Sequence, residues 1–292
     1  MNRSSRRVKP YSSLSLELCI LASGSGGNCT ILRTPEGVIL IDAGIGPRTT
    51  AKRMCGTGVS VADIRAICLT HLDSDHFRPT WLTTIQKQSI RLHCHESRLD
   101  YLRTTIGDPA FEPATFNGHP FEPIEQVKFH PLRLAHDEHG SHGFVIEGFG
   151  CRIGYATDLG RVPRELPDRF CDVDVLAIES NYDPEMEMNS PRPWFLKQRI
   201  MGGRGHLSNE QAFDAVKTIL DRCHKETRHM PQHIVLLHRS RECNCPKLLR
   251  RLFESDRRIA SRLTLAEQFE RTGWLKIRDR KPLVGEQLSL PL

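Results

Sequence analysis

A dense group of potential metal ligands follows a short apolar run, and it restricts the fold more than any other feature. Residues 66–69, Ala-Ile-Cys-Leu, are typical of the end of a buried strand. Helix-like sequence begins at about Pro79, a residue type common in the first turn of a helix. Between them stand four candidate ligands: His71, Asp73, Asp75 and His76. They occupy a strand-to-helix turn, where side chains can converge as they cannot on a straight strand.

Imidazole and carboxylate groups together suit Zn, Mn or Fe. The segment therefore predicts a metal site. The alternative is a polar turn with a capping Asp, which accounts for fewer of the four residues.

The composition is that of an ordinary globular protein, with 38% hydrophobic and 26% charged residues over 292 positions. No apolar run approaches the roughly 20 residues that span a bilayer, so we expect no membrane segment. The basic N-terminus has no apolar segment directly after it that resembles a signal peptide. Ten cysteines without regular spacing indicate reduced thiols, and hence a cytoplasmic protein.

Positive charge is concentrated late in the chain. Residues 239–281 hold 13 Lys/Arg against 6 Asp/Glu, whereas the whole chain has a net charge of +6. Two interpretations remain open: a solvated helix face, or a surface for a polyphosphate such as nucleic acid beside a hydrolytic site.

The chain divides into three parts. We expect a basic N-terminal tail over 1–12, one domain over 13–278 and a flexible C-terminal tail over 279–292. Within the domain, strand-like and helix-like segments alternate, but several strands follow one another directly. This order predicts an α/β (α+β) fold with two face-to-face sheets and helices outside.

The ligand-rich turn resembles the H-x-H-x-D-H signature of the metallo-β-lactamase (MBL) superfamily. Further segments resemble that family's motifs in the same order: Leu-Ile-Asp-Ala-Gly at 40–44, His136 after a strand, Tyr-Ala-Thr-Asp-Leu-Gly at 155–160 and Leu-Leu-His-Arg-Ser at 236–240. The YycJ/WalJ-like branch is closer still, through residues 21–28, 179–183, 194–200 and 204–209. The likeness runs from about residue 16 to 253 and implies a four-layer αββα sandwich.

The resemblance also implies a dinuclear site that activates water. One divalent ion would take His71, Asp73 and His136, the second Asp75, His76 and His238, and Asp158 would bridge them. The implied catalytic residues are Asp75, Glu179 and His206, and the last two would form a proton relay. For His206, a structural contact at the start of the next helix remains the alternative. Asp42 would orient a ligand histidine through its other ring nitrogen.

Asp73 departs from the family pattern, which usually has His there. A carboxylate is harder and shorter than imidazole, so it favours Mn over Zn. A weak first site, leaving a mononuclear enzyme, is the alternative. Among the remaining histidines, we expect His139 and His142 at the surface, and His93 and His95 in structural roles.

Ser23, Ser25 and Asn28 lie in a Gly-rich loop, which can bring backbone N–H groups to a phosphate.

The function predicted is that of a metal-dependent phosphodiesterase, a DNA exonuclease of replication or mismatch repair. One alternative is a hydrolase of a small phosphodiester, thioester or lactone. Another is a non-catalytic, metal-stabilised binding module. The histidines and carboxylates filling the ligand positions argue against the last.

The final hexapeptide, Gln-Leu-Ser-Leu-Pro-Leu at 287–292, resembles the motif with which bacterial replication and repair proteins bind the β sliding clamp. Gln287 would fix orientation by hydrogen bonds, and the apolar anchors would be Leu288, Leu290 and Leu292. The alternative is a frayed, mildly apolar terminus.

Overall fold

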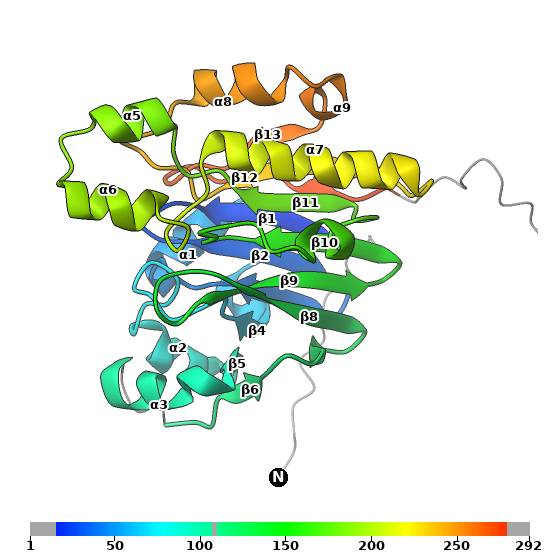
Figure 1. Cartoon of the computed structure of the whole chain (residues 1–292). Coiled ribbons are helices and arrows are strands. Elements are labelled where there is room, and N and C mark those ends of the chain that lie inside the picture. Colours follow the sequence, from blue (N-terminus) through cyan, green and yellow to red (C-terminus); the bar gives the residue numbers. More distant parts are fainter. Residues whose placement is uncertain (1–15, 107–109, 279–292) are drawn as a thin grey trace, which may run out of the picture.

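Two mixed β-sheets lie face to face, with helices on their outer sides (Figure 1). The computed structural model describes residues 16–106 and 110–278. Within these ranges each sheet has seven strands. The arrangement confirms the predicted αββα sandwich. The calls on residues 1–12 and 279–292 fall outside the described residues.

The first sheet begins as an antiparallel meander and continues in parallel from β3 to β6. Its strands, in spatial order, are β14 (Leu275–Lys276), β1 (Glu17–Ala22), β2 (Cys29–Thr34), β3 (Gly37–Ile41), β4 (Ile64–Cys68), β5 (Arg91–His95) and β6 (Ala114–Phe116).

The second sheet has the same plan, with an antiparallel half and a parallel half from β10 to β13. Its strands, in spatial order, are β13 (Leu263–Leu265), β12 (His233–Leu237), β11 (Val175–Glu179), β10 (Cys151–Ala156), β9 (Ser141–Gly148), β8 (Val127–Leu134) and β7 (Phe121–Ile124).

Helices cover the outer faces of the two sheets (Figure 1). They are α1 (Pro47–Met54), α2 (Trp81–Gln88), α3 (Leu99–Tyr101), α4 (Leu166–Arg169), α5 (Pro184–Asn189), α6 (Trp194–Met201), α7 (Asn209–Lys225), α8 (Pro246–Phe253) and α9 (Arg257–Ala260). Residues 96–106 form consecutive short helical segments: a 3-10 turn at Glu96–Arg98, helix α3, and a π-helical turn at Leu102–Ile106. Strands β6, β7, β13 and β14 are short and lie at or next to the sheet edges.

The apolar pattern explains how the layers hold together. Between the sheets, buried side chains such as Phe129, Phe144 and Ile153 form one cluster. Helix α7 covers the second sheet with an apolar stripe at helical spacing that includes Val216 and Ile219. Its start is fixed by a reciprocal cap, in which the side chains of Ser208 and Gln211 accept each other's backbone N–H.

The parallel halves set the place of the site. Strands β3, β4, β10, β11 and β12 all end at one edge, and in open α/β sheets ligands bind beyond such carboxyl ends. No helix of the described residues is long and apolar enough to cross a membrane.

Candidate metal centre

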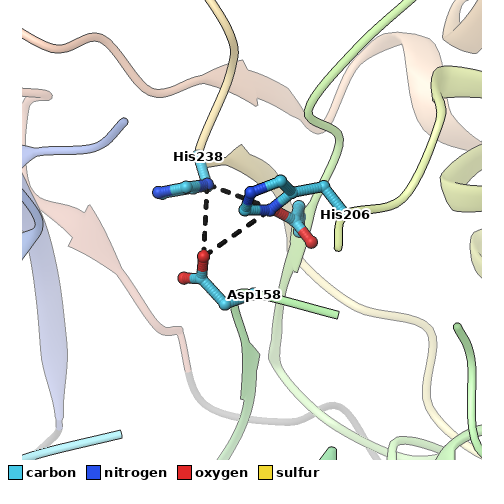
Figure 2. Close-up of side chains that lie close together, drawn as sticks. Asp158, His206 and His238 are labelled. Carbon is cyan, nitrogen blue, oxygen red and sulfur yellow. Dashed lines mark hydrogen bonds and ion pairs between the residues drawn. The ribbon is translucent and has the colours of Figure 1, made fainter. Parts of the chain in front are cut away.

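The chain gathers five histidines and several carboxylates at the carboxyl ends of the parallel strands. Three of them, Asp158 after β10, His238 after β12 and His206 before α7, point toward one another in Figure 2. Asp42, Asp158 and His238 have left-handed backbone angles, with φ of 60°, 55° and 51°. Such angles are uncommon outside Gly, although Asp and His adopt them more readily than most residues, and they often occur at functional sites.

Two triads of potential ligands form within this group. In the outer triad, Asp73 Oδ2 lies 3.7 Å from His71 Nε2 and 3.9 Å from His136 Nε2. In the inner triad, Asp75 Oδ2 lies 3.7 Å from His76 Nε2 and 3.3 Å from His238 Nε2. The ligand atoms within each triad all lie within 4.8 Å of one another. These are the two sets that the sequence predicted, brought together from strands far apart in the chain.

Asp158 lies between the two triads. Its Oδ2 is 2.9 Å from His76 Nε2 in the inner triad, and its Oδ1 is 3.8 Å from His136 Nε2 in the outer triad. The side chain is only 2% exposed. This carboxylate is therefore placed to contact ions in both triads.

Hydrogen bonds fix the orientation of three rings. His76 Nδ1 lies 2.8 Å from Asp42 Oδ2, and His136 Nδ1 donates to the carbonyl oxygen of Gly205 at 3.0 Å. His238 Nδ1 lies 3.1 Å from Glu179 Oε1 and from Asn181 Nδ2. In all three, Nε2 is left to face the cluster, as ligand histidines require.

Close packing supports the turn that carries the inner ligands. A Cβ on Gly44 would collide with the carbonyl oxygen of Asp75. Asn28 holds the same turn, because its backbone N–H donates to that oxygen at 2.7 Å. The Gly of the Leu-Ile-Asp-Ala-Gly segment is therefore needed for this close approach.

The charges of the group depend strongly on one another. Burial raises the pKa of Asp158, but the charges of His238 and His76 lower it by more than burial raises it. The pKa of Asp158 therefore lies well below its usual range. For Asp75, burial raises and His76 and His238 lower the pKa, to about 2. For His238, burial lowers the pKa and Asp158 raises it, to about 10. Asp158 and Asp75 thus stay ionised and attract positive charge, whereas burial raises the pKa of Asp73.

The donor set fits divalent cations. His71 Nε2 is buried without a hydrogen-bond partner among the described residues, an arrangement that a metal ion would satisfy. Burial and the neighbouring His76 keep the pKa of His71 well below its usual value, so its ring is neutral, as a ligand must be. Mixed imidazole and carboxylate ligands suit first-row divalent metals.

Glu179 and His206 form the pair that the sequence predicted. His206 Nδ1 lies 2.7 Å from Glu179 Oε1 and 3.6 Å from Asp158 Oδ1. Glu179 is fully buried, and its other oxygen accepts the backbone N–H of Leu159 at 2.7 Å. For His206, burial lowers the pKa but Glu179 raises it more, so the ring retains a proton more readily than usual.

The Gly-rich loop divides into different roles. Ser23 is buried, and its hydroxyl accepts the backbone N–H of His238 at 2.7 Å. Asn28 is also buried, with Nδ2 2.9 Å from His76 Nε2. Both therefore support ligand residues and do not face the cleft. Ser25 is exposed and lines the cavity beside His206, so it alone of the three is placed to meet a substrate.

Among the histidines outside the cluster, one differs from the prediction in its exposure to solvent. His142 was expected at the surface but is buried, because it stacks on His95 with ring centroids 4.3 Å apart. His139 is exposed, as predicted. His93 is buried and stacks on Phe121, in agreement with a structural role.

Two supporting residues were not singled out from the sequence. Thr70 donates through its backbone N–H and its hydroxyl to Asp42, and the same hydroxyl lies 3.0 Å from His71 Nδ1. Asn181 Nδ2 donates to the carbonyl oxygen of His238 at 2.6 Å. Thr70 directly precedes His71 and Asn181 lies two residues after Glu179, and that proximity was the available signal.

Open cavities reach the cluster from solvent. One, of about 420 Å³, is lined by Asp75, Asp158 and His206, and an adjoining one of about 540 Å³ by His71 and Asp73. Their guanidinium groups come from Arg98, Arg192, Arg199 and Arg204. The basic residues of α8 and α9 line neither cavity, and several are paired with acids, as for a solvated helix face.

An αββα sandwich with two His/Asp triads and a shared carboxylate at its strand ends defines a metallo-hydrolase. The β-lactamase superfamily domain model matches residues 38–234, and the chain belongs to that family.

Two curated relatives are named as exonucleases. Exodeoxyribonuclease YycJ of Bacillus anthracis is 26% identical over 238 residues, which cover 81% of this chain and 87% of the relative. Exodeoxyribonuclease WalJ of Streptococcus pneumoniae is 26% identical over 241 residues, covering 81% and 86%. The resemblance to the YycJ/WalJ-like branch is thereby confirmed.

Solved structures share the fold. The metallo-β-lactamase fold protein YhfI of Bacillus subtilis superposes with a TM-score of 0.65 at 12% identity, covering 88% of this chain and 99% of that one. The short form of human tRNase Z gives 0.60 at 19% identity, covering 90% and 100%. At these identities the comparison concerns the fold alone.

Proposed function

We propose that this protein is a metal-dependent phosphodiesterase that acts as a DNA exonuclease. One observation carries the proposal: two ligand triads share the buried Asp158, and the Glu179–His206 pair lies directly beside them. The relatives named exodeoxyribonuclease, aligned over most of both chains, support DNA as the substrate.

The residues present would hold two divalent ions, one in the outer and one in the inner triad, with Asp158 contacting both. Bound there, such ions lower the pKa of water and stabilise charge on a phosphoryl oxygen. We further propose that Mn is preferred to Zn. Asp73 supplies a carboxylate, which is a harder ligand than the imidazole usual at this position, and harder ligands favour Mn.

The chain's own groups supply orientation and a proton. Asp42 and Asn181 hold His76 and His238 in place by the hydrogen bonds described above. Glu179 engages His206 at Nδ1, so Nε2 is the ring atom available to protonate a leaving oxygen in the cavity. Ser25 would contact the phosphate, because it is the loop residue that is exposed and lines the cavity.

An end-labelling assay tests the proposal. Purified protein would be incubated with end-labelled single- and double-stranded DNA and RNA, after EDTA treatment and resupply with Mn, Mg or Zn. We expect release of mononucleotides from DNA, loss with EDTA and best recovery with Mn. Equal or better recovery with Zn would reject the Mn preference. Turnover of only small phosphodiesters, thioesters or lactones would favour the small-molecule alternative.

We also propose that the protein is cytoplasmic and that residues 287–292, which lie outside the described residues, bind the bacterial β sliding clamp. A short apolar peptide of this kind binds with micromolar-range affinity, because ordering it costs entropy. Deletion of 287–292 should abolish clamp binding, measured by fluorescence anisotropy, and leave hydrolysis of short DNA unchanged. Undiminished binding by the truncated chain would exclude the tail as the contact.

A further inference from the structure

Two aromatic rings stand in solvent at the start of α6. Trp194 is 58% exposed and Phe195 is 71% exposed, although the same short helix buries Ile200. In Figure 1, α5 and α6 form a hairpin at the left edge of the molecule, set apart from the sheets. Large exposed rings are a cost to a folded protein unless something covers them.

The hairpin does not need these rings for its own packing. Its apolar cluster is made by Ile200, Tyr182 and Cys243, with Leu196 packed against them. The connection between its helices is held by Arg192, which pairs with both Glu187 and Glu242. Because other side chains hold the hairpin, the two rings are presented outward on a fixed support.

Helical spacing connects the rings to the metal centre. Phe195 lies four residues before Arg199, and Trp194 lies four before Gln198, so each ring shares a helix face with a residue nearer the cluster. Arg199 lines both cavities beside the triads, and Gln198 lines the one that contains His71 and Asp73. One side of α6 thus runs from the exposed rings to the candidate ligands.

The guanidinium groups along this route are suited to bind phosphate oxygens, and they stand in a cavity that also holds Asp73, Asp137 and Glu138. Arg199 is paired with Asp137 through Nε at 3.1 Å, which holds it at the cavity wall. Arg98 and Arg204 line the same cavity. Aromatic rings beside such groups are the arrangement by which proteins bind single strands, because every base has a face that can stack.

We propose that Trp194 and Phe195 stack on unpaired bases of a single-stranded DNA end whose backbone passes Arg199 toward the metal centre. The proposal rests on the proposed nuclease function. It adds which part of the substrate the protein binds, namely the unpaired bases at the end of the strand. Bases in a duplex are already stacked on each other, so the rings select frayed or single-stranded ends.

The test compares bases with bare backbone of equal charge. Fluorescence anisotropy would measure binding of two labelled, phosphorothioate-protected single strands to the Mn-loaded full chain: oligothymidylate and an abasic strand of the same length. The variants are W194A, F195A and W194A/F195A. The matched control is L248A, which truncates an apolar side chain on α8 that is 39% exposed and lines neither cavity.

We expect wild type and L248A to prefer oligothymidylate over the abasic strand by about 5- to 150-fold for each stacked base. The double variant should lose that preference and bind both strands alike. All variants should hydrolyse bis(p-nitrophenyl) phosphate at the wild-type rate, because that substrate is too small to reach the rings. Oligothymidylate should also quench Trp fluorescence in wild type more than in W194A.

The outcomes separate this proposal from the proposed function. An unchanged preference in W194A/F195A, or no preference in wild type, overturns stacking even if DNA is hydrolysed. A wild type that shows the preference but cleaves no DNA would overturn the nuclease function and leave the binding site standing. A dimer that W194A/F195A converts to monomer, seen by light scattering, would assign the rings to a second copy of this chain instead.

Discussion

The two triads differ in how firmly the protein holds them. In the inner triad His76 is fully buried and His238 is 2% exposed, and both are tied to buried neighbours, Asp42 and Glu179. In the outer triad Asp73 has a side chain that is 46% exposed, and it approaches its histidines at 3.7 and 3.9 Å. The inner triad is therefore pre-organised, whereas the outer triad has two buried histidines and one ligand, Asp73, that is open to solvent.

This difference implies a division of labour. A rigid set of ligands binds an ion tightly because little order is lost on binding, whereas an exposed carboxylate must be fixed by the ion itself. The inner triad should retain its ion, and the outer triad should exchange its ion readily. We therefore expect the departure at Asp73 to weaken one half of the site and to leave the other complete.

Removal of the shared carboxylate should have the largest effect. Asp158→Ala removes the group that lies between the triads, so we expect loss of hydrolysis and of most bound metal. Elemental analysis of the purified variant gives the metal content directly. If the variant keeps two ions per chain, the assignment of Asp158 as the bridge is wrong.

The next effect concerns proton transfer beside the inner triad. His206→Ala should lower turnover by about 10²–10⁴-fold, the usual range for a general acid. Metal content should stay near normal, because His206 belongs to neither triad. His224→Ala, an exposed histidine on α7, is the control and should behave as wild type. A loss of metal in His206→Ala would make that residue a ligand.

A smaller effect should follow from loosening one inner ligand. Asp42→Ala removes the carboxylate that orients His76, and such supporting groups contribute about 10–100-fold to metal affinity. Competition with a metal-binding dye would measure the change. An affinity equal to that of wild type would show that Thr70 and the surrounding packing hold the ring without Asp42.

The smallest effect should come from restoring the common family residue. Asp73→His supplies a softer ligand, so the ratio of Zn-supported to Mn-supported turnover should rise a few-fold. The inner triad should be unaffected, because Asp73 reaches His76 only through its backbone carbonyl oxygen, which accepts the N–H of His76 at 2.8 Å and which the substitution keeps. A ratio that does not move would remove the argument from ligand hardness.

Much of the site was predictable because its ligands stand in short motifs next to strands. His71 and Asp158 each stand one threonine after an apolar run, so the end of each strand locates the residue. The alternation within the Val127–Leu134 strand was equally clear. The burial of loop residues could not be predicted from the sequence. Ser23 and Asn28 are polar and lie in a loop, yet packing of distant segments buries them.

The position of the charged surface was also beyond the sequence. Residues 239–281 carry the largest local excess of positive charge, so a phosphate-binding surface was considered there. The guanidinium groups at the cavities instead come from residues such as Arg98 and Arg204, which are scattered along the chain. Tertiary folding brings them together. His142 shows the same effect, because the ring that covers it, His95, belongs to the other sheet.

A metal titration tests the central claim, that an inner and an outer ion site of unequal strength together support hydrolysis. EDTA-stripped protein would be titrated with Mn by calorimetry while hydrolysis of bis(p-nitrophenyl) phosphate is followed in parallel. We predict two binding steps of different affinity, with turnover rising mainly in the second, and loss of the weaker step in Asp73→Ala. Two steps of equal affinity, or full turnover in the stripped protein, would contradict the account.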